Sequence, residues 1–266
     1  MIVRGLFHLH TRVSKDATLT HEDHTAHARS NGLSFLLFAE HRETMTPEEV
    51  RAAAERCDAL STDDLLLVPG QEQQTEPLGL HVIGAGVREP LEAVEPRSVV
   101  DEIRERGGVS VLAHPFRYRR KTRDPLFLAA LAALDGIEGY NLRYDGRAGV
   151  REEVRSLVAS RPDAVAVAGL DAHDPEDLAH PDEPVLVVDA ERLEERALLG
   201  AIGAGRFTLE SGGRPLDLRR AAPLASKVAA TLHRGVFAVA RGAKRGLARV
   251  GLSPPEAWVR RMRRRF

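Results

Sequence analysis

Cysteine occurs only once in the 266 residues, at Cys57. A single cysteine excludes an internal disulfide and any zinc finger built from cysteine pairs. The first residues, MIVRGLF, contain no long apolar segment of the kind found in a signal peptide. No apolar run reaches the roughly 18 residues that a membrane-spanning helix needs. These absences predict a cytoplasmic protein without a transmembrane segment.

Glycine-rich phosphate loops are also missing. No G-x-G-x-x-G follows the first apolar run, and no G-x-x-x-x-G-K-[ST] occurs in the chain. The sequence therefore gives little support to a nucleotide-binding Rossmann or P-loop protein. There is no internal repeat and no long low-complexity segment.

Charge is distributed unevenly, although the net charge is only −1. From residue 213 onward, 14 Lys and Arg stand against 2 Asp and Glu, which is a net charge of +12. The first 212 residues therefore carry a net −13. We interpret residues 1–212 as an acidic domain and residues 213–266 as a separate basic tail.

Basic and apolar residues alternate in the tail at roughly helical spacing, which predicts a mainly helical extension. Its charge favours contact with a polyanion, either a nucleic acid or an anionic membrane surface. The second case would make the protein peripherally membrane-associated. Docking of the tail on the acidic domain of the same or a neighbouring subunit is the alternative, and the oligomeric state is left open.

Short apolar runs alternate with amphipathic segments over the first 212 residues. Eight runs predict strands at 3–7, 34–39, 64–70, 81–85, 109–113, 137–141, 164–169 and 184–188. Intervening segments predict helices at 20–32, 46–60, 95–108 and 189–205, with Thr20 and Thr46 as N-caps. Continuous apolar strands that alternate with helices indicate parallel strands buried on both faces, in a barrel or a doubly wound sheet.

Imidazole and carboxylate side chains border most of these strands. They are His8, His10, Asp16, His41, Glu72, His81, His114, Asp171 and His173. In α/β barrels the C-terminal ends of the strands meet at one mouth, so we expect these side chains to converge there. Such ligands without thiolates suit Zn²⁺, Mn²⁺ or Fe²⁺. The set is too large for one ion and sufficient for two or three that share a bridging carboxylate.

The motifs HLHTRVSKD, AEH, GQE, LH, LAHPFR and GLDAH follow one another in this order. Together they resemble the successive motifs of the PHP (polymerase and histidinol phosphatase) superfamily, over roughly residues 1–212. The resemblance implies a distorted (β/α)7 barrel of the TIM type, a site for two or three metal ions, and phosphoesterase activity.

The resemblance also implies a division of the ligands among the ions. One ion would be held by His8, His10, Glu72 and Asp171. Glu72 would bridge to a second ion held by His81 and His114, and a third would be held by Asp16, His41 and His173. The attacking water would be bound to metal held by Glu72, Asp171 and His173.

Two positions depart from the pattern of the superfamily. Phe7 stands where an acid usually precedes the first histidine, and Glu40 stands where an aspartate usually precedes the histidine of the second motif. Since both positions are next to ligands, they bear on metal affinity and metal identity rather than on the ligand set.

Three arginines follow predicted strand ends and are candidates for binding phosphate. They are Arg42, Arg117 and Arg143. A guanidinium can donate two parallel hydrogen bonds to a phosphate, and Arg117 is the first candidate of the three. His21, His24 and His27 lack this context and are expected on the polar side of a helix.

The leading hypothesis is a hydrolase of phosphate monoesters that acts on a small phosphorylated substrate through a metal-activated hydroxide. A protonated side chain such as a histidine would assist the leaving alkoxide. One alternative, motivated by the basic tail, is a phosphodiesterase or exonuclease on nucleotides or short oligonucleotides. Others are a non-catalytic scaffold of PHP type and a C–N hydrolase, although no lysine is placed as a carboxylated bridge.

Overall fold

The structure is a computed structural model that describes residues 1–118, 124–146 and 149–219. Most of the basic tail expected at 213–266 therefore lies outside the described residues. The described chain continues past Gly212 into a short strand, β12 (Arg214–Pro215), and to the buried side chain of Leu218.

Two six-stranded sheets form the frame of a mixed α/β fold. The first has the order β12, β11 (Phe207–Ser211), β10 (Pro184–Asp189), β1 (Ile2–Leu9), β2 (Phe35–Phe38) and β4 (Leu66–Val68). The second has the order β3 (Glu40–His41), β5 (Gly70–Gln74), β6 (His81–Ala85), β7 (Val109–Leu112), β8 (Gly136–Asn141) and β9 (Val165–Gly169). The eight predicted strands are all present, and the α/β class is confirmed.

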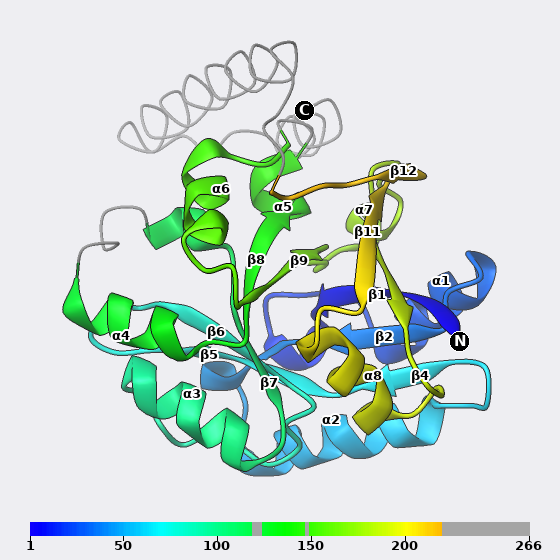
Figure 1. Cartoon of the computed structure of the whole chain (residues 1–266). Helices are drawn as coiled ribbons and strands as arrows, with labels where there is room; N and C mark the ends of the chain where they lie inside the picture. The colour runs from blue at the N-terminus through cyan, green and yellow to red at the C-terminus, as the bar shows by residue number, and fades with distance from the viewer. Residues whose placement is uncertain (119–123, 147–148, 220–266) are drawn as a thin grey trace, which may run out of the picture.

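Eight α-helices lie within the described residues. They are α1 (His21–Ser30), α2 (Pro47–Leu60), α3 (Pro96–Glu105), α4 (Pro125–Ala133), α5 (Leu142–Asp145), α6 (Glu152–Ala159), α7 (Pro175–Leu178) and α8 (Glu195–Gly203). Thr20 and Thr46 begin α1 and α2 with capping boxes, as predicted. Figure 1 shows α2, α3 and α8 along one side of the strands, with α5, α6 and α7 on the opposite side.

The expectation of purely parallel strands is wrong. β6 runs antiparallel to both β5 and β7, and β10 runs antiparallel to β1 and β11. Only residues 75–80 separate β5 from β6, which is too short for the crossover that a parallel pair requires. As a result, β6 begins, at His81, on the side where its neighbours β5 and β7 end.

The two sheets meet where the polar residues gather. β2 leads into β3 across one residue, Ala39, and β4 leads into β5 across Pro69. The end of β1 is hydrogen-bonded to the segment after β9, where the amide of Asp171 donates to the carbonyl of His8 at 2.8 Å. The amide of His10 donates in turn to the carbonyl of Ala172 at 3.0 Å.

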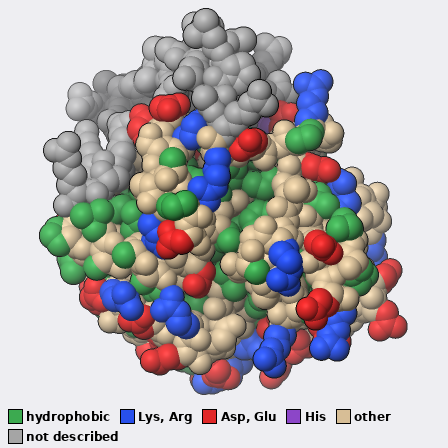
Figure 2. All heavy atoms as spheres, in the orientation of Figure 1, with side chains coloured by type: hydrophobic (Ala, Val, Ile, Leu, Met, Phe, Trp, Pro, Cys, Tyr) green, Lys and Arg blue, Asp and Glu red, His purple; other side chains and the backbone are tan. Residues whose placement is uncertain are grey.

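The main core lies behind this junction and includes the fully buried rings of Phe7, Phe35 and Phe38. On the face drawn in Figure 2, acidic and basic side chains of the described residues are interspersed. No helix in the described part of the chain is long and apolar enough to cross a membrane.

Candidate metal centre

Glu72, in β5, lies at the centre of the cluster and is fully buried. Its Oε1 is 2.9 Å from Nδ1 of His81 and 2.8 Å from Nε2 of His114. Its Oε2 is 3.0 Å from Nδ1 of His41 and 3.7 Å from Nε2 of both His8 and His10. The two oxygens thus face different histidines, as a bridging carboxylate requires.

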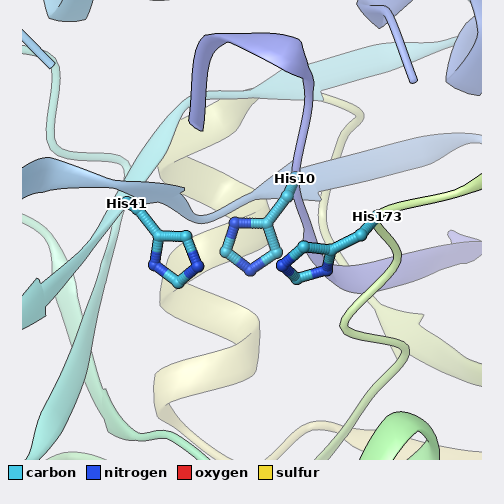
Figure 3. A group of neighbouring side chains, drawn as sticks. All are labelled: His10, His41 and His173. Carbon is cyan, nitrogen blue, oxygen red and sulfur yellow. The ribbon is translucent and has the colours of Figure 1, made fainter. Parts of the chain in front are cut away.

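Asp171 and Asp16 complete the cluster from loops. Oδ1 of Asp171 is 3.5 Å from Nε2 of His10 and 3.4 Å from Nδ1 of His173. Oδ2 of Asp16 is 3.4 Å from Nε2 of His41 and 3.3 Å from Nε2 of His173. Figure 3 shows the rings of His10, His41 and His173 side by side. The structure therefore brings all nine predicted side chains together, although Asp16 joins only through this last pair of histidines.

Several polar atoms at the centre have no hydrogen-bond partner although they are buried. They are Nε2 of His8, Nε2 of His10, Nδ1 of His41 and Oε2 of Glu72, and the last two lie 3.0 Å apart without forming a hydrogen bond. A buried polar atom without a partner is rare because desolvation is costly. Divalent ions would satisfy these atoms, so the residues fit a metal centre.

Within the described part of the chain, four overlapping groups of three ligand atoms are close enough to share an ion, with all atoms of a group within 4.8 Å of one another. They are His10, His41 and His173; His8, His10 and Glu72; His8, His114 and Asp171; and His41, Glu72 and His81. Imidazole and carboxylate donors of this kind bind divalent metals.

Backbone strain is concentrated at the same place. Among the described residues, the only non-glycine residues with positive φ are His8 at 68°, Lys15 at 64°, His114 at 29° and Asp171 at 56°. At His8 the register of β1 with β2 also shifts, so simple strand alternation does not explain why His8 and His10 meet. Such conformations persist where the surroundings enforce them, often at functional sites.

Neighbouring charges and burial shift the pKa values of the cluster strongly. Burial and the neighbouring histidines lower the pKa of His10 to about 3. Burial alone would lower the pKa of His41, but the carboxylates of Asp16 and Glu72 raise it to about 10. The surrounding histidines hold the pKa of Glu72 and of Asp171 well below the usual range, against the effect of burial. Both carboxylates are therefore charged and available as ligands.

The described side chains of the cluster differ in exposure. The side chain of Asp16 is 55% exposed and that of His41 is 14% exposed, whereas those of His8, His10 and Glu72 are completely buried. Asp16 therefore lies at the solvent-facing edge of the cluster.

The three arginines occupy different surroundings. Arg117 is exposed, and its guanidinium lies 5.5 Å from the ring centre of Tyr144, which is itself 5.0 Å from the ring of His114. Arg143 pairs with Asp177 at 3.3 Å.

Arg42 is directed elsewhere. Its Nε donates to the carbonyl of Leu91 at 3.0 Å, and its Nη1 donates to the carbonyl of Met45 at 2.9 Å. The guanidinium of Arg42 is therefore engaged by backbone carbonyls, whereas that of Arg117 lies beside Tyr144, whose ring neighbours that of the predicted ligand His114.

The two departures from the superfamily pattern have clear structural roles. Phe7 packs in the core, 1% exposed. Glu40 is buried and accepts hydrogen bonds from the amide of Thr11 and the hydroxyl of Ser14. The same hydroxyl accepts from the amide of His41 at 2.9 Å and lies 3.4 Å from Nδ1 of His10. Glu40 thus supports two ligands through Ser14.

Sequence reasoning did not identify Glu138 or Asn141, both of which are 1% exposed beside the cluster. Nδ1 of His8 donates to Oε1 of Glu138 at 2.8 Å, and Nδ2 of Asn141 donates to Oδ2 of Asp171 at 3.1 Å. A signal was present, because Glu138 is the one charged residue in the apolar run IEGYN and burial would demand a partner for it.

The expectation that all three histidines of α1 face solvent is wrong. His21 is 6% exposed and His24 is fully buried, and both pack against the ring of Phe38. α1 contains few apolar residues, so histidines fill part of its inner face. His27 is half-buried and pairs with Glu183 at 2.7 Å.

No family model and no curated protein matches this sequence. Among solved structures, a two-domain protein from Bacteroides vulgatus that contains a predicted PHP-like metal-dependent phosphoesterase aligns with a TM-score of 0.62 and 18% identity, over 79% of this chain and 64% of that chain. A lesion-specific endonuclease from Pyrococcus furiosus aligns with a TM-score of 0.56 and 14% identity, over 77% of this chain and 56% of that chain.

PsfC from Pseudomonas syringae aligns with a TM-score of 0.56 and 15% identity, over 89% of this chain and 99% of that chain. The chain shares its fold with the Bacteroides protein that contains a predicted PHP-like metal-dependent phosphoesterase, which agrees with the resemblance seen in the sequence at the level of the fold. The chain spans less than two thirds of the length of the Bacteroides and Pyrococcus proteins.

Proposed function

We propose that this protein is a metal-dependent phosphoesterase that hydrolyses phosphate monoesters with two or three divalent ions, Mn²⁺, Zn²⁺ or Fe²⁺. The observation that carries the proposal is the buried cluster around Glu72, whose unpartnered nitrogen and oxygen atoms point at one another. The fold shared with PHP-like phosphoesterases supports the same reaction class.

We also propose that the strands belong to one distorted seven-stranded barrel. In this arrangement β2 and β3 form one strand path, β4 and β5 form another, and β1 closes the ring with the segment after β9. Support comes from the short junctions at Ala39 and Pro69 and from the hydrogen bonds of Leu170 to Phe7 and of Asp171 to His8.

We expect the ligands to divide among the ions as the resemblance implies. Nε2 of His8 and Nε2 of His10 each lie 3.7 Å from Oε2 of Glu72, and Asp171 lies 3.5 Å from His10. His81 and His114 lie at Oε1 of Glu72. Asp16 contacts His41 and His173, and His41 also lies 3.0 Å from Oε2 of Glu72, which connects this group to the first. Divalent ions in such a site would bind phosphate oxygens and would lower the pKa of a bound water to near neutral pH. The chain itself supplies charged carboxylates, neutral His10 and a largely dry environment.

Arg117 is the proposed phosphate contact. It is exposed at the edge of the site, and the ring of Tyr144 lies between it and His114. A guanidinium in this place can balance the phosphate charge that the ions leave uncompensated. Arg143, held by Asp177, is a second candidate nearer to α7.

The test is a comparison of metal content and hydrolysis of p-nitrophenyl phosphate between the wild type and His10→Ala. His27→Ala is the matched control, since His27 lies on α1 and pairs with Glu183 outside the cluster. We expect His10→Ala to lose metal and activity and His27→Ala to retain both. Normal activity in His10→Ala would refute the proposal.

A panel that includes bis-p-nitrophenyl phosphate separates monoesterase from diesterase activity. A diesterase whose rate falls steeply with salt would favour the nuclease alternative and a polyanion contact by the basic tail. Full metal content without turnover of any ester would favour a non-catalytic protein.

A further inference from the structure

β8 contains an irregularity that aims two polar side chains at the metal centre. Its register with β9 shifts between Glu138 and Tyr140, which leaves Gly139 as the extra residue. In a regular strand, residues three apart point to opposite faces, and a bulge can redirect one of them. Here Glu138 and Asn141 lie together, with Nδ2 of Asn141 donating to Oε2 of Glu138 at 2.9 Å.

This pair connects residues from three other parts of the chain. Oε1 of Glu138 accepts from Nδ1 of His8, and Oε2 accepts from the backbone amide of His114. The second amide hydrogen of Asn141 is donated to Oδ2 of Asp171 at 3.1 Å. Four buried hydrogen bonds therefore involve these two side chains of β8: Glu138 accepts three of them, and Asn141 donates the fourth to Asp171.

The three residues that the pair contacts are also the three strained residues of the cluster. His8, His114 and Asp171 all have positive φ, whereas Lys15, the other such residue among those described, contacts Thr44 and Glu49 instead of the pair. Strained conformations persist only when surrounding contacts hold them.

The geometry points to Glu138 and Asn141 as positioning residues that hold three metal ligands of this site in their binding geometry. This inference rests on the proposed function only in taking His8, His114 and Asp171 as ligands. Glu138 keeps the proton of His8 on Nδ1, so that Nε2, which is buried and unpartnered, offers its lone pair to an ion.

Gly169 leaves the space that Glu138 needs. A Cβ at this position would overlap Oε1 of Glu138, so β9 passes beside the carboxylate without a side chain. The same Cβ would come within 3.0 Å of Cβ of His8, whereas the φ of Gly169 is not in the left-handed region.

Replacement of Glu138 by glutamine keeps the shape of the side chain and replaces one of its two acceptor oxygens by an NH2 group, which can only donate. The backbone amide of His114 can only donate, and so can Nδ2 of Asn141, so the single carbonyl oxygen of glutamine is required at the Oε2 position. The amide nitrogen then faces His8 and donates to Nδ1. His8 would carry its proton on Nε2, which blocks the lone pair that an ion needs.

The experiment measures zinc affinity of the full chain by competition with a chelating dye, for the wild type, Glu138→Gln, Asn141→Ser and Asp135→Asn. Asp135 is the control because it also accepts bonds from a backbone amide and a hydroxyl, those of Ser110, at the start of β7. We expect Glu138→Gln to weaken zinc binding about 10- to 100-fold. Asn141→Ser should weaken it in the same direction, and Asp135→Asn should leave it unchanged.

The ¹⁵N spectrum of histidine-labelled, zinc-loaded protein supplies a readout that loss of stability alone would not change. The wild type should show His8 with a protonated Nδ1 and a metal-bound Nε2, and Glu138→Gln should lose this pattern. Unchanged zinc affinity in a folded Glu138→Gln protein would overturn this inference but not the proposed function. If Glu138→Gln does not fold, the zinc affinity of Asn141→Ser provides the test, and an unchanged value would again overturn the inference. Zinc binding by the wild type without phosphatase activity would overturn the proposed function while leaving this inference intact.

Discussion

At the scale of single residues, Glu72 makes the largest contribution to the proposed centre. Each of its oxygens faces a different set of histidines, at 2.8–3.0 Å for the nearest of them. Glu72→Gln leaves only one acceptor oxygen, so we expect metal affinity to fall at least about tenfold, with activity. Equilibrium dialysis with Mn²⁺ measures the change, and Glu89→Gln, an exposed residue paired with Arg51, is the control.

The buried side chain of His21 should make the free energy of unfolding depend on pH. Burial lowers its pKa to about 4, so His21 is neutral in the folded protein while the unfolded chain binds a proton below about 6.5. The unfolded state then binds more protons, and stability is lost as the pH falls from about 6.5 to about 4. The loss is on the order of 3 kcal/mol.

Urea unfolding at pH 7.5 and pH 4.5 tests this expectation, with His21→Phe as the variant that cannot titrate. The difference in unfolding free energy between the two pH values should be smaller in His21→Phe. An equal difference in both proteins would show that His21 does not contribute.

The members of the buried cluster could be predicted from the sequence because their motifs have an unusual order and position relative to apolar runs. Glu138 could have been noticed as a charge within an apolar run, but the arrangement of Glu138 and Asn141 depends on a bulge at Gly139 that no local pattern indicates. Burial of His21 likewise depends on the neighbouring Phe38 rather than on the sequence of α1.

At the scale of elements, the N-terminus of α2 offers a simple test of local stability. The Thr46 side chain accepts from the amide of Glu49, and the Glu49 side chain accepts from the amide of Thr46. Thr46→Ala should lower the unfolding free energy by about 1 kcal/mol and leave metal affinity unchanged. Chemical denaturation measures the first, and a large change in metal binding would contradict the separation of this helix end from the site.

Helices and central strands could be predicted from caps and apolar periodicity. β5 was not recognised as a separate strand because its sequence, GQEQQ, has no apolar pattern, and its pairing with β6 defines it instead. The predicted direction of β6 was wrong for a related reason, since the direction of a strand depends on the length and path of the preceding loop, here residues 75–80. Both errors concern the strands that carry Glu72 and His81, in which polar residues occupy positions that are usually apolar.

At the scale of the whole molecule, the proposed metal binding would be coupled to folding. The cluster joins residues from β1 to the segment after β9, so an ion that binds only the folded chain stabilises all of it. Free metal at about 100 times the dissociation constant should add about 2.7 kcal/mol to the unfolding free energy. Thermal melts with added Mn²⁺ and after chelation measure this difference, and identical melting temperatures would contradict it.

The most direct measurement is elemental analysis of the purified protein together with its phosphomonoesterase rate, before chelation, after chelation and after metal is restored. We predict two or three Mn, Zn or Fe ions per chain, loss of activity on chelation and recovery on restoration. A protein that binds none of these metals, or that hydrolyses the ester equally well without them, would contradict the proposal of a metal-dependent phosphoesterase.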